Sequence, residues 1–390
     1  MYPDLLRCFT NHGHHVLVIC ARERRHGLPT QITKECDIDV LRIRTGNITK
    51  TNILEKGITT IFIGTQFKLA IKKHVRDIKF DLILYATPPI TLVNTIRYIK
   101  KRDQACAYLM LKDIFPQNAL DLGILKKSGW RWIVTAYFQY KEKSLYQISD
   151  RIGCMSQANI EYVKTHYDSI DCNKLEICPN TIDPSIKQTP NIIYLREKYQ
   201  IPLNKIIFIC CGNFGKPQDV AFIIQVLKNN KSKNDRHFVI CGSGTDYYKL
   251  QELDNEIDKN VSIYNYKRKE ELGELIGACD VGLIFLDHRF TIPNYPSRIL
   301  DYMNLGLPIF AATDCNSDIG VTILDGGFGW WCESNDITKY QNILDDICIR
   351  KEELEGKKEN SRQYLIKYFN TEIAYERIKS ACDEREKNRE

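Results

Sequence analysis

The stretch Ile206–Leu227 constrains the fold more than any other part of the chain. It begins with six apolar residues, continues through a turn that contains Gly212 and Gly215, and ends in a segment of helical periodicity from Asp219 onward. An uninterrupted apolar run beside a helix is typical of a strand in a parallel sheet that helices cover on both faces. We therefore expect an α/β fold built on a parallel sheet.

The turn in this stretch is also a candidate phosphate site. Glycine lets the backbone approach a ligand closely, and the N-terminus of the following helix offers N–H groups to an anion. Lys216 lies just ahead of that helix and adds a positive charge. A tight strand-to-helix turn without any ligand explains the same pattern equally well, because two glycines three residues apart form a weak motif.

The length of the chain predicts two domains, because 390 residues exceed one ordinary hydrophobic core. Prolines at 179, 184 and 190 mark a linker between them. We expect an N-terminal domain over residues 1–180, a C-terminal domain over 181–370, and a last helix over 371–390 that packs back on the first domain.

Two further features predict a cytoplasmic protein. No apolar run is long enough to span a bilayer, and the N-terminus carries no signal-peptide pattern. The fifteen cysteines are scattered without a C-x-x-C pair, and several, such as Cys210 and Cys241, lie within apolar strands. This usage favours reduced thiols in the core over disulfides.

The charge is uneven along the chain. Residues 1–190 carry 28 Lys and Arg against 18 Asp and Glu, whereas acidic residues are in excess in the remainder. This asymmetry predicts an anionic partner for the first half, such as a membrane surface, a lipid phosphate or a nucleic acid, unless it is chance surface variation. Because the basic residues form no RNA-binding signature, we do not expect nucleic-acid binding.

The segment Ile124–Tyr146 interleaves basic residues, from Lys126 to Lys143, with Trp130, Trp132 and several tyrosines. Basic residues mixed with Trp and Tyr are typical of a helix that lies on an anionic membrane face. An amphipathic helix packed on its own sheet, with a solvated basic side, is equally compatible.

The N-terminal region departs from a doubly wound domain, which normally starts with a strand and a glycine turn. Here the chain starts with a predicted helix over Met1–Asn11, so we expect the first strand to be missing. Residues 22–60 are polar and basic, and we expect a long loop there.

Two short motifs in this region are candidate metal ligands. His12, His14 and His15 have no carboxylate or cysteine partner nearby in the sequence, and we expect them to be solvated. Asp37 and Asp39 form a D-x-D motif, which can hold a metal–diphosphate pair, but no glycine-rich or strand-end context supports that role. We expect no metal cofactor.

Two loops of the first half follow predicted strands, over Asp81–Ala86 and Ala105–Leu111. Ligands of open α/β sheets bind at the carboxyl ends of the strands, so Thr87–Pro89 and Lys112–Gln117 are candidate site loops. Asp113 is the carboxylate best placed for catalysis, although a helix N-cap explains it equally well.

Several segments of the chain together resemble one family, the GT-B glycosyltransferases of family four, which are retaining enzymes. They are most similar to the fucosamine-transferase-like enzymes of capsule and O-antigen biosynthesis. The segments are Cys211–Gln218, Cys241–Gly244, Cys279–Leu283, Tyr295–Met303, Leu111–Gln117 and Cys178–Asp183.

This resemblance implies two facing, doubly wound Rossmann-like domains with a cleft between them. The C-terminal domain would bind the nucleotide-sugar donor, and the N-terminal domain the acceptor. Asp113 would be the catalytic carboxylate, and acceptor contacts would come from Thr87, Pro88, Lys112 and Gln117. The implied donor-binding residues are Gly212, Asn213, Gly215, Lys216, Gln218, Gly242, Ser243, Gly244, Tyr264, Pro296, Ser297, Arg298 and Asp301.

The chain also departs from the family pattern. Asp301 stands where the family has a glutamate that binds the ribose hydroxyls, and Pro293 stands where the family has a second glutamate. The family's first strand and its glycine-rich loop have no counterpart in this sequence, and we therefore expect either a truncated start or an inactive protein.

The activity that the resemblance implies is transfer of a sugar from a nucleotide-sugar, expected to be a UDP-sugar, to a polyprenyl-diphosphate-linked glycan. The enzyme would act in the cytoplasm, in peripheral contact with the inner membrane surface. Negative charge develops on the leaving diphosphate, and helix N–H groups, Lys216 and Arg298 would stabilise it without a metal. The alternatives are a GT-B sugar-nucleotide epimerase and a non-catalytic nucleotide-sugar-binding protein. A dehydrogenase is disfavoured because no G-x-G-x-x-G follows a strand.

Overall fold

The computed structural model describes residues 2–48, 51–129, 132–184, 191–253 and 260–387. Pro190 of the predicted linker and Trp130 of the predicted basic segment lie outside these ranges. The chain divides into two compact units. Unit 1 comprises Met1–Thr181 with Thr371–Glu390, and unit 2 comprises Ile182–Asn370.

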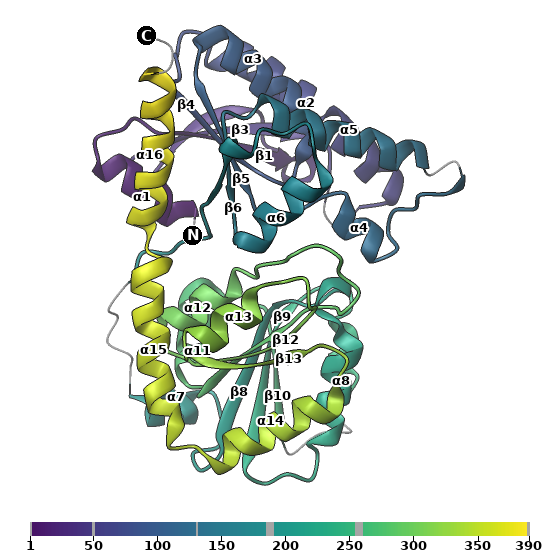
Figure 1. Cartoon of the computed structure of the whole chain (residues 1–390), viewed down its shortest axis with the longest axis vertical. Helices are drawn as coiled ribbons and strands as arrows, with labels where there is room; N and C mark the ends of the chain where they lie inside the picture. The colour runs from purple at the N-terminus through teal and green to yellow at the C-terminus, as the bar shows by residue number, and fades with distance from the viewer. Residues whose placement is uncertain (1, 49–50, 130–131, 185–190, 254–259, 388–390) are drawn as a thin grey trace. The chain divides into compact units, whose positions relative to one another are not determined.

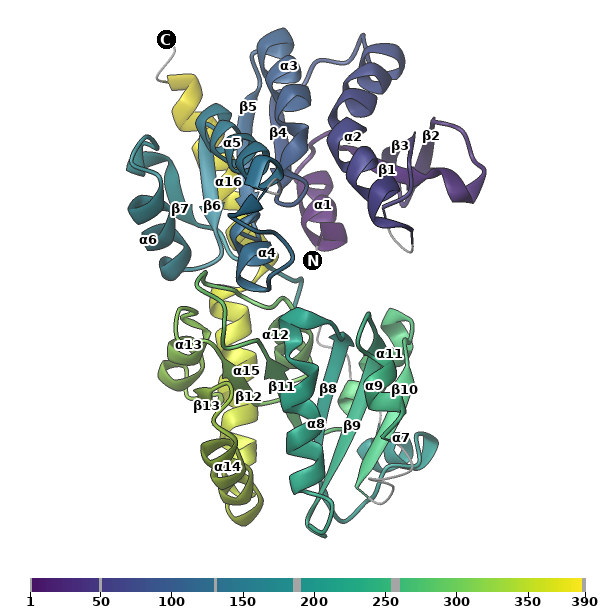
Figure 2. The same cartoon turned by 90° about the vertical axis from the view of Figure 1, so that its right-hand side faces the viewer.

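Unit 1 contains a four-stranded parallel sheet in the order β4-β5-β6-β7 (Figure 2). Every side chain of β5 is buried, as the uninterrupted apolar sequence of that strand requires. The helices between these strands pack on the sheet or beside it. The elements are β4 (Leu82–Ala86), η2 (Ile90–Leu92), α3 (Val93–Asp103), β5 (Cys106–Leu111), α4 (Gln117–Asp121), α5 (Trp132–Ile148), β6 (Arg151–Cys154), α6 (Gln157–His166) and β7 (Leu175–Ile177).

The first and last helices of the chain, α1 (Tyr2–Asn11) and α16 (Thr371–Lys387), pack together on one face of this sheet (Figure 1). Leu5 of α1 and Tyr375 of α16 share one buried cluster with Tyr108 and Met110 of β5. An ion pair of 3.1 Å between Arg385 and Asp150 adds to this contact. The C-terminal helix is therefore part of the core of unit 1.

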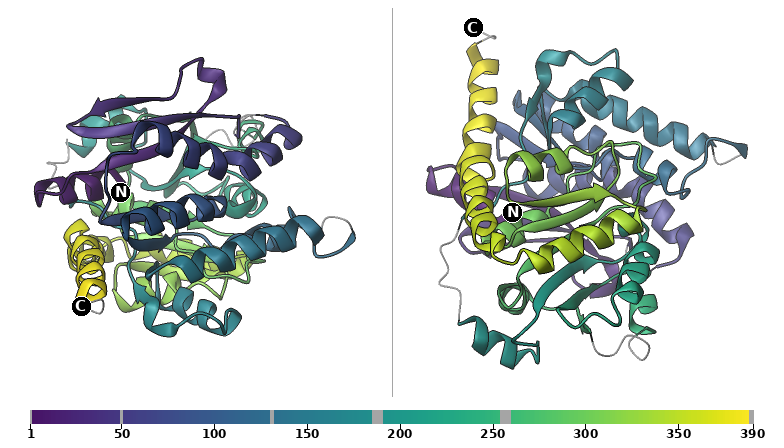
Figure 3. Two further views of the ribbon diagram at one scale, coloured as in Figure 1. Left: turned by 90° about the horizontal axis from the view of Figure 1, so that it is seen from above. Right: turned by 60° about the horizontal axis from the view of Figure 1, so that its bottom comes forward.

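A second, three-stranded sheet of unit 1 contains β1 (Leu17–Glu23), β2 (Gln31–Glu35) and β3 (Ile38–Thr45) in the order β1-β3-β2. The expectation of a long loop over residues 22–60 is therefore wrong. β2 is a short antiparallel edge strand whose Lys and Glu side chains are exposed, so its sequence resembles a loop. The long helix α2 (Ile53–His74) packs on β3, as Figure 3 shows on its left.

The two sheets of unit 1 share a core without joining. Leu17 and Ile19 of β1 and Ile83 of β4 all pack against one cluster formed by β3, α2 and α3. β1 pairs only with β3, and β4 pairs only with β5, among the described residues. β4 and the first five residues of β1 are apolar, yet most side chains of the two strands are only partly buried.

Unit 2 is a six-stranded, fully parallel sheet in the order β10-β9-β8-β11-β12-β13. Its strands coincide closely with the apolar runs of the sequence. The strands are β8 (Ile206–Asn213), β9 (Arg236–Ser243), β10 (Val261–Asn265), β11 (Val281–Phe285), β12 (Ile309–Thr313) and β13 (Gly329–Glu333). The helices are α7 (Ile192–Lys198), α8 (Val220–Asn229), α9 (Tyr248–Gln251), α11 (Lys269–Gly277), α12 (Arg298–Asn304), α13 (Ile319–Asp325), α14 (Ile337–Ile349) and α15 (Glu353–Tyr368).

Helices α8 and α14 form the core of unit 2 with one face of this sheet (Figure 3, right). Phe222 and Val226 of α8 and Tyr340 of α14 pack against Phe208 and Phe310 of the strands. This apolar layer fixes β8 and β11 as neighbours in the centre of the sheet. The same packing sets the position of the loops that follow the carboxyl ends of β8 and β11.

Candidate active site

The order of the strands in unit 2 reverses between β8 and β11. From β8 the chain continues outward through β9 and β10, and then returns to β11 on the other side of β8. In open α/β sheets, ligands bind outside the carboxyl ends of the strands at such a reversal. A pocket of about 220 Å³ lies at this end of the sheet. Its lining residues are Gly212, Asn213, Cys241, Gly242, Ser243, Tyr266, Lys267, Leu272 and Arg298.

The turns that follow β8 and β9 pack backbone against backbone beside this pocket. A Cβ atom at Gly242 would lie 1.9 Å from the carbonyl oxygen of Gly212, and a Cβ at Gly244 would lie 2.1 Å from that of Phe214. Gly244 also has a φ of +151°, which other residues rarely adopt. Close packing of the two turns therefore requires both glycines, whether or not a ligand is bound.

Arg298, at the start of α12, is the guanidinium that lines the pocket. Its Nη1 atom lies 2.7 Å from Oδ2 of Asp301, one turn along the same helix. Its Nη2 atom would lie 3.2 Å from a Cβ at Gly212, so a side chain there would press on the guanidinium. The ion pair thus holds the Arg298 cation over the end of β8.

Tyr302 fixes α12 against the sheet. Its buried hydroxyl accepts a hydrogen bond from the N–H of Cys211 at 3.1 Å and lies 3.2 Å from the carbonyl oxygens of Ile209 and Leu283. A Cβ at Gly282 would overlap its ring. The packing of Tyr302 therefore determines where Arg298 is placed.

Two pocket residues that the sequence reasoning missed, Tyr266 and Lys267, follow the carboxyl end of β10. Tyr266 is 72% exposed, so its aromatic ring is accessible to solvent. Tyr264 was predicted instead, but its hydroxyl donates to the carbonyl oxygen of Tyr199, and it does not line the pocket. The strand-end rule could have identified Tyr266, because it is the first residue after β10, which ends at Asn265.

Several other predicted donor residues contact their own turn. The N–H of Gly215 donates to Oε1 of Gln218 at 3.1 Å. At the N-terminus of α8, the Asp219 carboxylate accepts from the N–H of Phe222 at 3.2 Å, so this end already holds a negative charge. The expectation of free N–H groups there is therefore wrong for Phe222. Lys216, Pro296 and Ser297 lie outside the pocket lining, and the Ser297 side chain makes no capping hydrogen bond.

In unit 1, Thr87, Lys112 and Asp113 come together where β4 and β5 end. The N–H of Asp113 approaches the Thr87 hydroxyl at 3.4 Å, and Oδ1 of Asp113 accepts from the side-chain amide of Asn118 at 2.8 Å. Burial raises the pKa of Asp113 to about 6 and lowers the pKa of Lys112 to about 8. The Lys112 ammonium donates to the side chain of Asn180.

The remaining predicted acceptor residues are Pro88 and Gln117. Pro88 directly follows Thr87, and both of its peptide bonds are cis. The amide of Gln117 donates to Asp121 within the same short helix at 2.7 Å.

The buried carboxyl of Glu142 on α5 was not predicted. It accepts hydrogen bonds from the hydroxyls of Tyr146, at 2.8 Å, and Tyr167. Burial, with a smaller contribution from the charge of Asp113, raises the pKa of Glu142 to about 7. Its position inside a basic, aromatic segment gave no sequence signal that it would be buried.

The potential metal ligands of the described residues form two groups, Cys8 with His12 and Glu372, and Asp219 with Asp287 and His288. The expectation that the histidines have no cysteine or carboxylate partner is therefore wrong for His12. Sγ of Cys8, four residues earlier, lies 3.9 Å from its Nδ1, and Oε2 of Glu372, from the other end of the chain, lies 3.5 Å from its Nε2. Asp37 and Asp39 of the D-x-D motif lie at the exposed β2–β3 hairpin. Nζ of Lys34 lies 3.6 Å from Oδ1 of Asp37.

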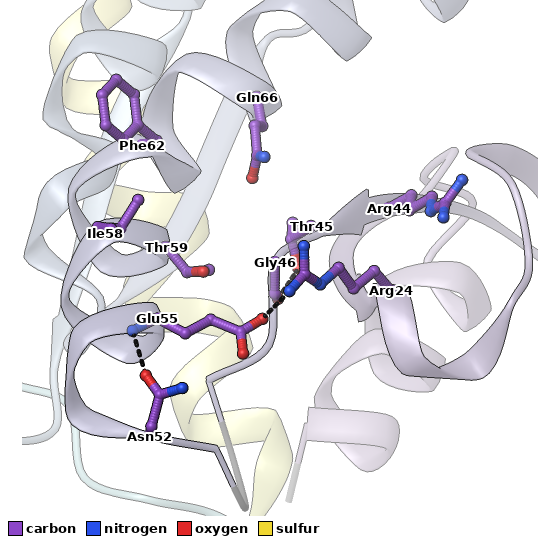
Figure 4. Close-up of a pocket in the computed structure, with 10 residues that line it drawn as sticks. All are labelled: Arg24, Arg44, Thr45, Gly46, Asn52, Glu55, Ile58, Thr59, Phe62 and Gln66. Carbon is purple, nitrogen blue, oxygen red and sulfur yellow. Dashed lines mark hydrogen bonds and ion pairs between the residues drawn. The ribbon is translucent and has the colours of Figure 1, made fainter.

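A larger pocket, of about 770 Å³, lies in unit 1 between the ends of β1 and β3 and the start of α2 (Figure 4). None of the predicted acceptor residues lines it. Among the described residues we find no helix with the length and apolar character that a membrane crossing needs.

Comparison with known proteins shows which enzymes this chain is similar to. Residues 192–364 match the family model "Glycosyl transferases group 1". The probable glycosyltransferase WbjE of Pseudomonas aeruginosa is 24% identical over 332 residues, which cover 82% of this chain and 78% of WbjE.

Two solved structures are similar over nearly the whole chain. WaaG, a glycosyltransferase involved in lipopolysaccharide biosynthesis, superposes with a TM-score of 0.66 at 14% identity, covering 97% of this chain and 94% of WaaG. Anabaena HepE in complex with UDP superposes with a TM-score of 0.64 at 14% identity, covering 89% of this chain and 87% of HepE. The chain therefore has the GT-B fold, and with the sequence matches it is a glycosyltransferase.

Proposed function

We propose that the chain transfers a sugar from a UDP-sugar to a lipid-linked glycan in surface polysaccharide biosynthesis. The observation that carries the donor half of this proposal is the Arg298 guanidinium, held over the end of β8 in the pocket of unit 2. The complex of HepE with UDP supports a uridine nucleotide, and the role of WaaG in lipopolysaccharide biosynthesis supports the pathway class.

The pocket suits part of a nucleoside diphosphate. Arg298 supplies a fixed cation for the diphosphate, and Tyr266 supplies an exposed ring on which a base can stack. A volume of about 220 Å³ holds only part of a nucleotide-sugar, so the sugar extends beyond it. As the glycosidic bond breaks, negative charge grows on the leaving diphosphate, and the preformed cation stabilises it.

Asp113 is the proposed acid–base or acceptor-orienting group. Its carboxylate is ordered by Asn118, and its pKa of about 6 leaves it ionised at neutral pH but close enough to accept a proton. Thr87 and Lys112 beside it supply a hydroxyl and an ammonium group for an acceptor.

Membrane contact of unit 1 is proposed through the start of α5 and the loop before it. Trp132 and Ile133 are 55% and 59% exposed, and Lys126 and Lys127 of the preceding loop are exposed as well. Phe138 and Leu145 of the same helix are buried, so α5 packs on unit 1 while Trp132, Ile133 and Val134 at its start are exposed. Apolar and basic groups side by side fit an anionic lipid surface.

Calorimetry with UDP tests the donor site. We expect saturable binding to the wild-type chain and a loss of about tenfold or more in Arg298→Ala, because a charge-assisted hydrogen bond contributes about 1.5–3 kcal/mol. Arg350→Ala is the matched control, since Arg350 also pairs with an acid three residues away, at 3.7 Å, but lies outside the pocket. Unchanged binding in Arg298→Ala would reject this pocket as the donor site.

Sedimentation with vesicles tests the membrane contact separately. Vesicles of phosphatidylglycerol should retain the wild-type chain more than phosphatidylcholine vesicles do, and Trp132→Ser with Ile133→Ser should abolish the difference. UDP binding should be unchanged in this variant. Equal retention of wild type and variant would contradict the membrane role of α5.

A further inference from the structure

Figure 4 shows the pocket of unit 1, whose residues could bind a ligand. This pocket is separate from the group of residues around Asp113. It lies where the parallel strands β1 and β3 end, and Arg24, Thr45 and Gly46 come from these ends. Its other wall is the first half of α2. A volume of about 770 Å³ is in the range that encloses a ligand of two or three sugar units in size.

The floor of the pocket is built around Glu55. Its carboxylate accepts from the side-chain amide of Asn47 at 2.9 Å and from the hydroxyl of Thr51 at 2.5 Å. It also pairs with Arg24 at 2.7 Å, as the dashed line in Figure 4 marks. The charge of Glu55 is therefore already balanced, and the Arg24 guanidinium is held in place.

Two polar groups of the pocket lack such partners. Arg44 is exposed and makes no ion pair among the described residues. Oε1 of Gln66 is buried but has no hydrogen-bond partner in the described structure, and Figure 4 shows its carboxamide directed into the pocket. An unpaired buried oxygen costs free energy, and a hydroxyl donor of a ligand would remove that cost.

The remaining walls combine apolar and hydroxyl groups. Ile58 and Phe62 are 60% and 55% exposed, and they project from α2. A Cβ at Gly46 would lie 2.1 Å from Oγ1 of Thr59, so the absence of a side chain there allows the hydroxyl to approach the end of β3. The surface thus offers donors and acceptors for hydroxyl groups beside an apolar face for C–H groups.

We propose that this pocket binds an anionic saccharide, with its carboxylate or phosphate on Arg44 and its hydroxyls on Gln66 and Thr59. Two arginines against one paired glutamate leave the pocket with an excess positive charge, which favours an anionic over a neutral sugar. Planar guanidinium groups pair with carboxylate and phosphate oxygens in bidentate geometry. The saccharide would be the recognised part of the acceptor, and that role rests on the proposed function, whereas the binding itself does not.

Calorimetry with defined probes tests the proposal on the whole chain. The probes are hyaluronan tetrasaccharide, which carries uronate carboxylates, and glucose 6-phosphate; chitotetraose is the neutral control and inorganic phosphate the control without a sugar. We expect at least one anionic saccharide to bind more tightly than both controls. Arg44→Ala should weaken that binding about tenfold and Gln66→Leu about threefold or more. The preferred probe distinguishes a uronate from a sugar phosphate.

Controls separate this proposal from the donor site and from misfolding. Arg76→Ala removes another exposed arginine of unit 1 and should bind the probes as the wild type does. UDP binding should be unchanged in Arg44→Ala and Gln66→Leu. If neither anionic saccharide binds better than the controls, or if Arg44→Ala binds as wild type does, the proposal is wrong. If UDP fails to bind the wild type while the saccharide binds, the proposed donor fails and this site stands.

Discussion

The ion pair between Arg298 and Asp301 allows two roles for Asp301 to be separated by measurement. In the family that the sequence resembles, an acid at this position binds the ribose hydroxyls. In the structure its Oδ2 atom lies 2.7 Å from Arg298, so it can act by positioning the cation instead. The perturbation is Asp301→Ala, alone and combined with Arg298→Ala, with UDP affinity as the readout.

The expected magnitudes follow from burial and geometry. Arg298 and Asp301 are 31% and 38% exposed, and a pair this accessible to solvent contributes about 1 kcal/mol or less. If Asp301 acts only by positioning Arg298, removal of its carboxylate should lower the affinity for UDP about fivefold or less. A direct, charge-assisted contact with ribose would cost about 1.5–3 kcal/mol, a factor of about ten or more.

The double variant decides between the two roles. If the effect passes through Arg298, Asp301→Ala in the Arg298→Ala background should change UDP affinity by no more than about twofold, because the energies of coupled residues are not additive. Calorimetry or competition with a fluorescent nucleotide measures each corner of the cycle. A further loss of about tenfold in the double variant would refute the positioning role and assign Asp301 a direct contact with the donor.

Three further predictions follow from the buried groups and the glycine turns. Asp113→Asn should reduce turnover strongly and leave UDP affinity unchanged. Wild-type activity should fall as the pH drops through about 6, where Asp113 becomes protonated, and a pH profile of sugar transfer measures this. Unchanged turnover in the variant would contradict this role of Asp113. The carboxyl of Glu142 has a pKa of about 7 in the folded state against 4.5 in the unfolded state, so the native state binds the proton more tightly and loses stability as the pH rises from about 4.5 through 7. Glu142→Gln should flatten this part of the pH dependence of the melting temperature. An unchanged slope would show that Glu142 does not cause this pH dependence. Gly244→Ala should lower the urea midpoint because its Cβ would meet the Phe214 backbone, whereas Gly273→Ala, in the open interior of α11, should raise stability by about 0.5–1 kcal/mol; equal midpoints for the two variants would contradict the packing argument.

The sheet of unit 2 could be predicted from the sequence because its four central strands are buried on both faces. The central strands β8, β9, β11 and β12 contain apolar runs that end in a glycine or a polar loop. The glycine turn at Gly212 was predicted as a ligand site from its own residues, whereas Gly242 was assigned to the donor site only by the family resemblance, and both line the pocket. Tyr266 and Lys267 were missed because a loop residue has no periodicity that shows where it points. The Arg298–Asp301 pair has the i, i+3 spacing of neighbours on a helix, but each residue had been assigned its own ligand contact.

Unit 1 was harder to predict, since its half-buried elements carry mixed sequences. β2 is an edge strand of mostly polar residues, and in β3 the exposed or partly exposed Asp39, Arg42 and Arg44 lie between buried residues. The pocket at Arg44 and Gln66 forms only when β3 and α2 pack together, and no motif within either segment indicates it. Likewise, Glu142 is buried by Tyr146 and Tyr167, and the second of these lies on a different part of the chain.

The separate edges of β1 and β4 have a consequence for the behaviour of the protein in concentrated solution. Each edge presents a row of backbone N–H and C=O groups without a ladder partner among the described residues, and Leu17–Ala21 and Leu82–Ala86 carry no charge that would repel another strand. Such edges act as templates for intermolecular β-pairing. We expect self-association of this chain to begin at these two strands, and a lysine introduced at Ile19 or Leu84 to suppress it at the expense of some core packing.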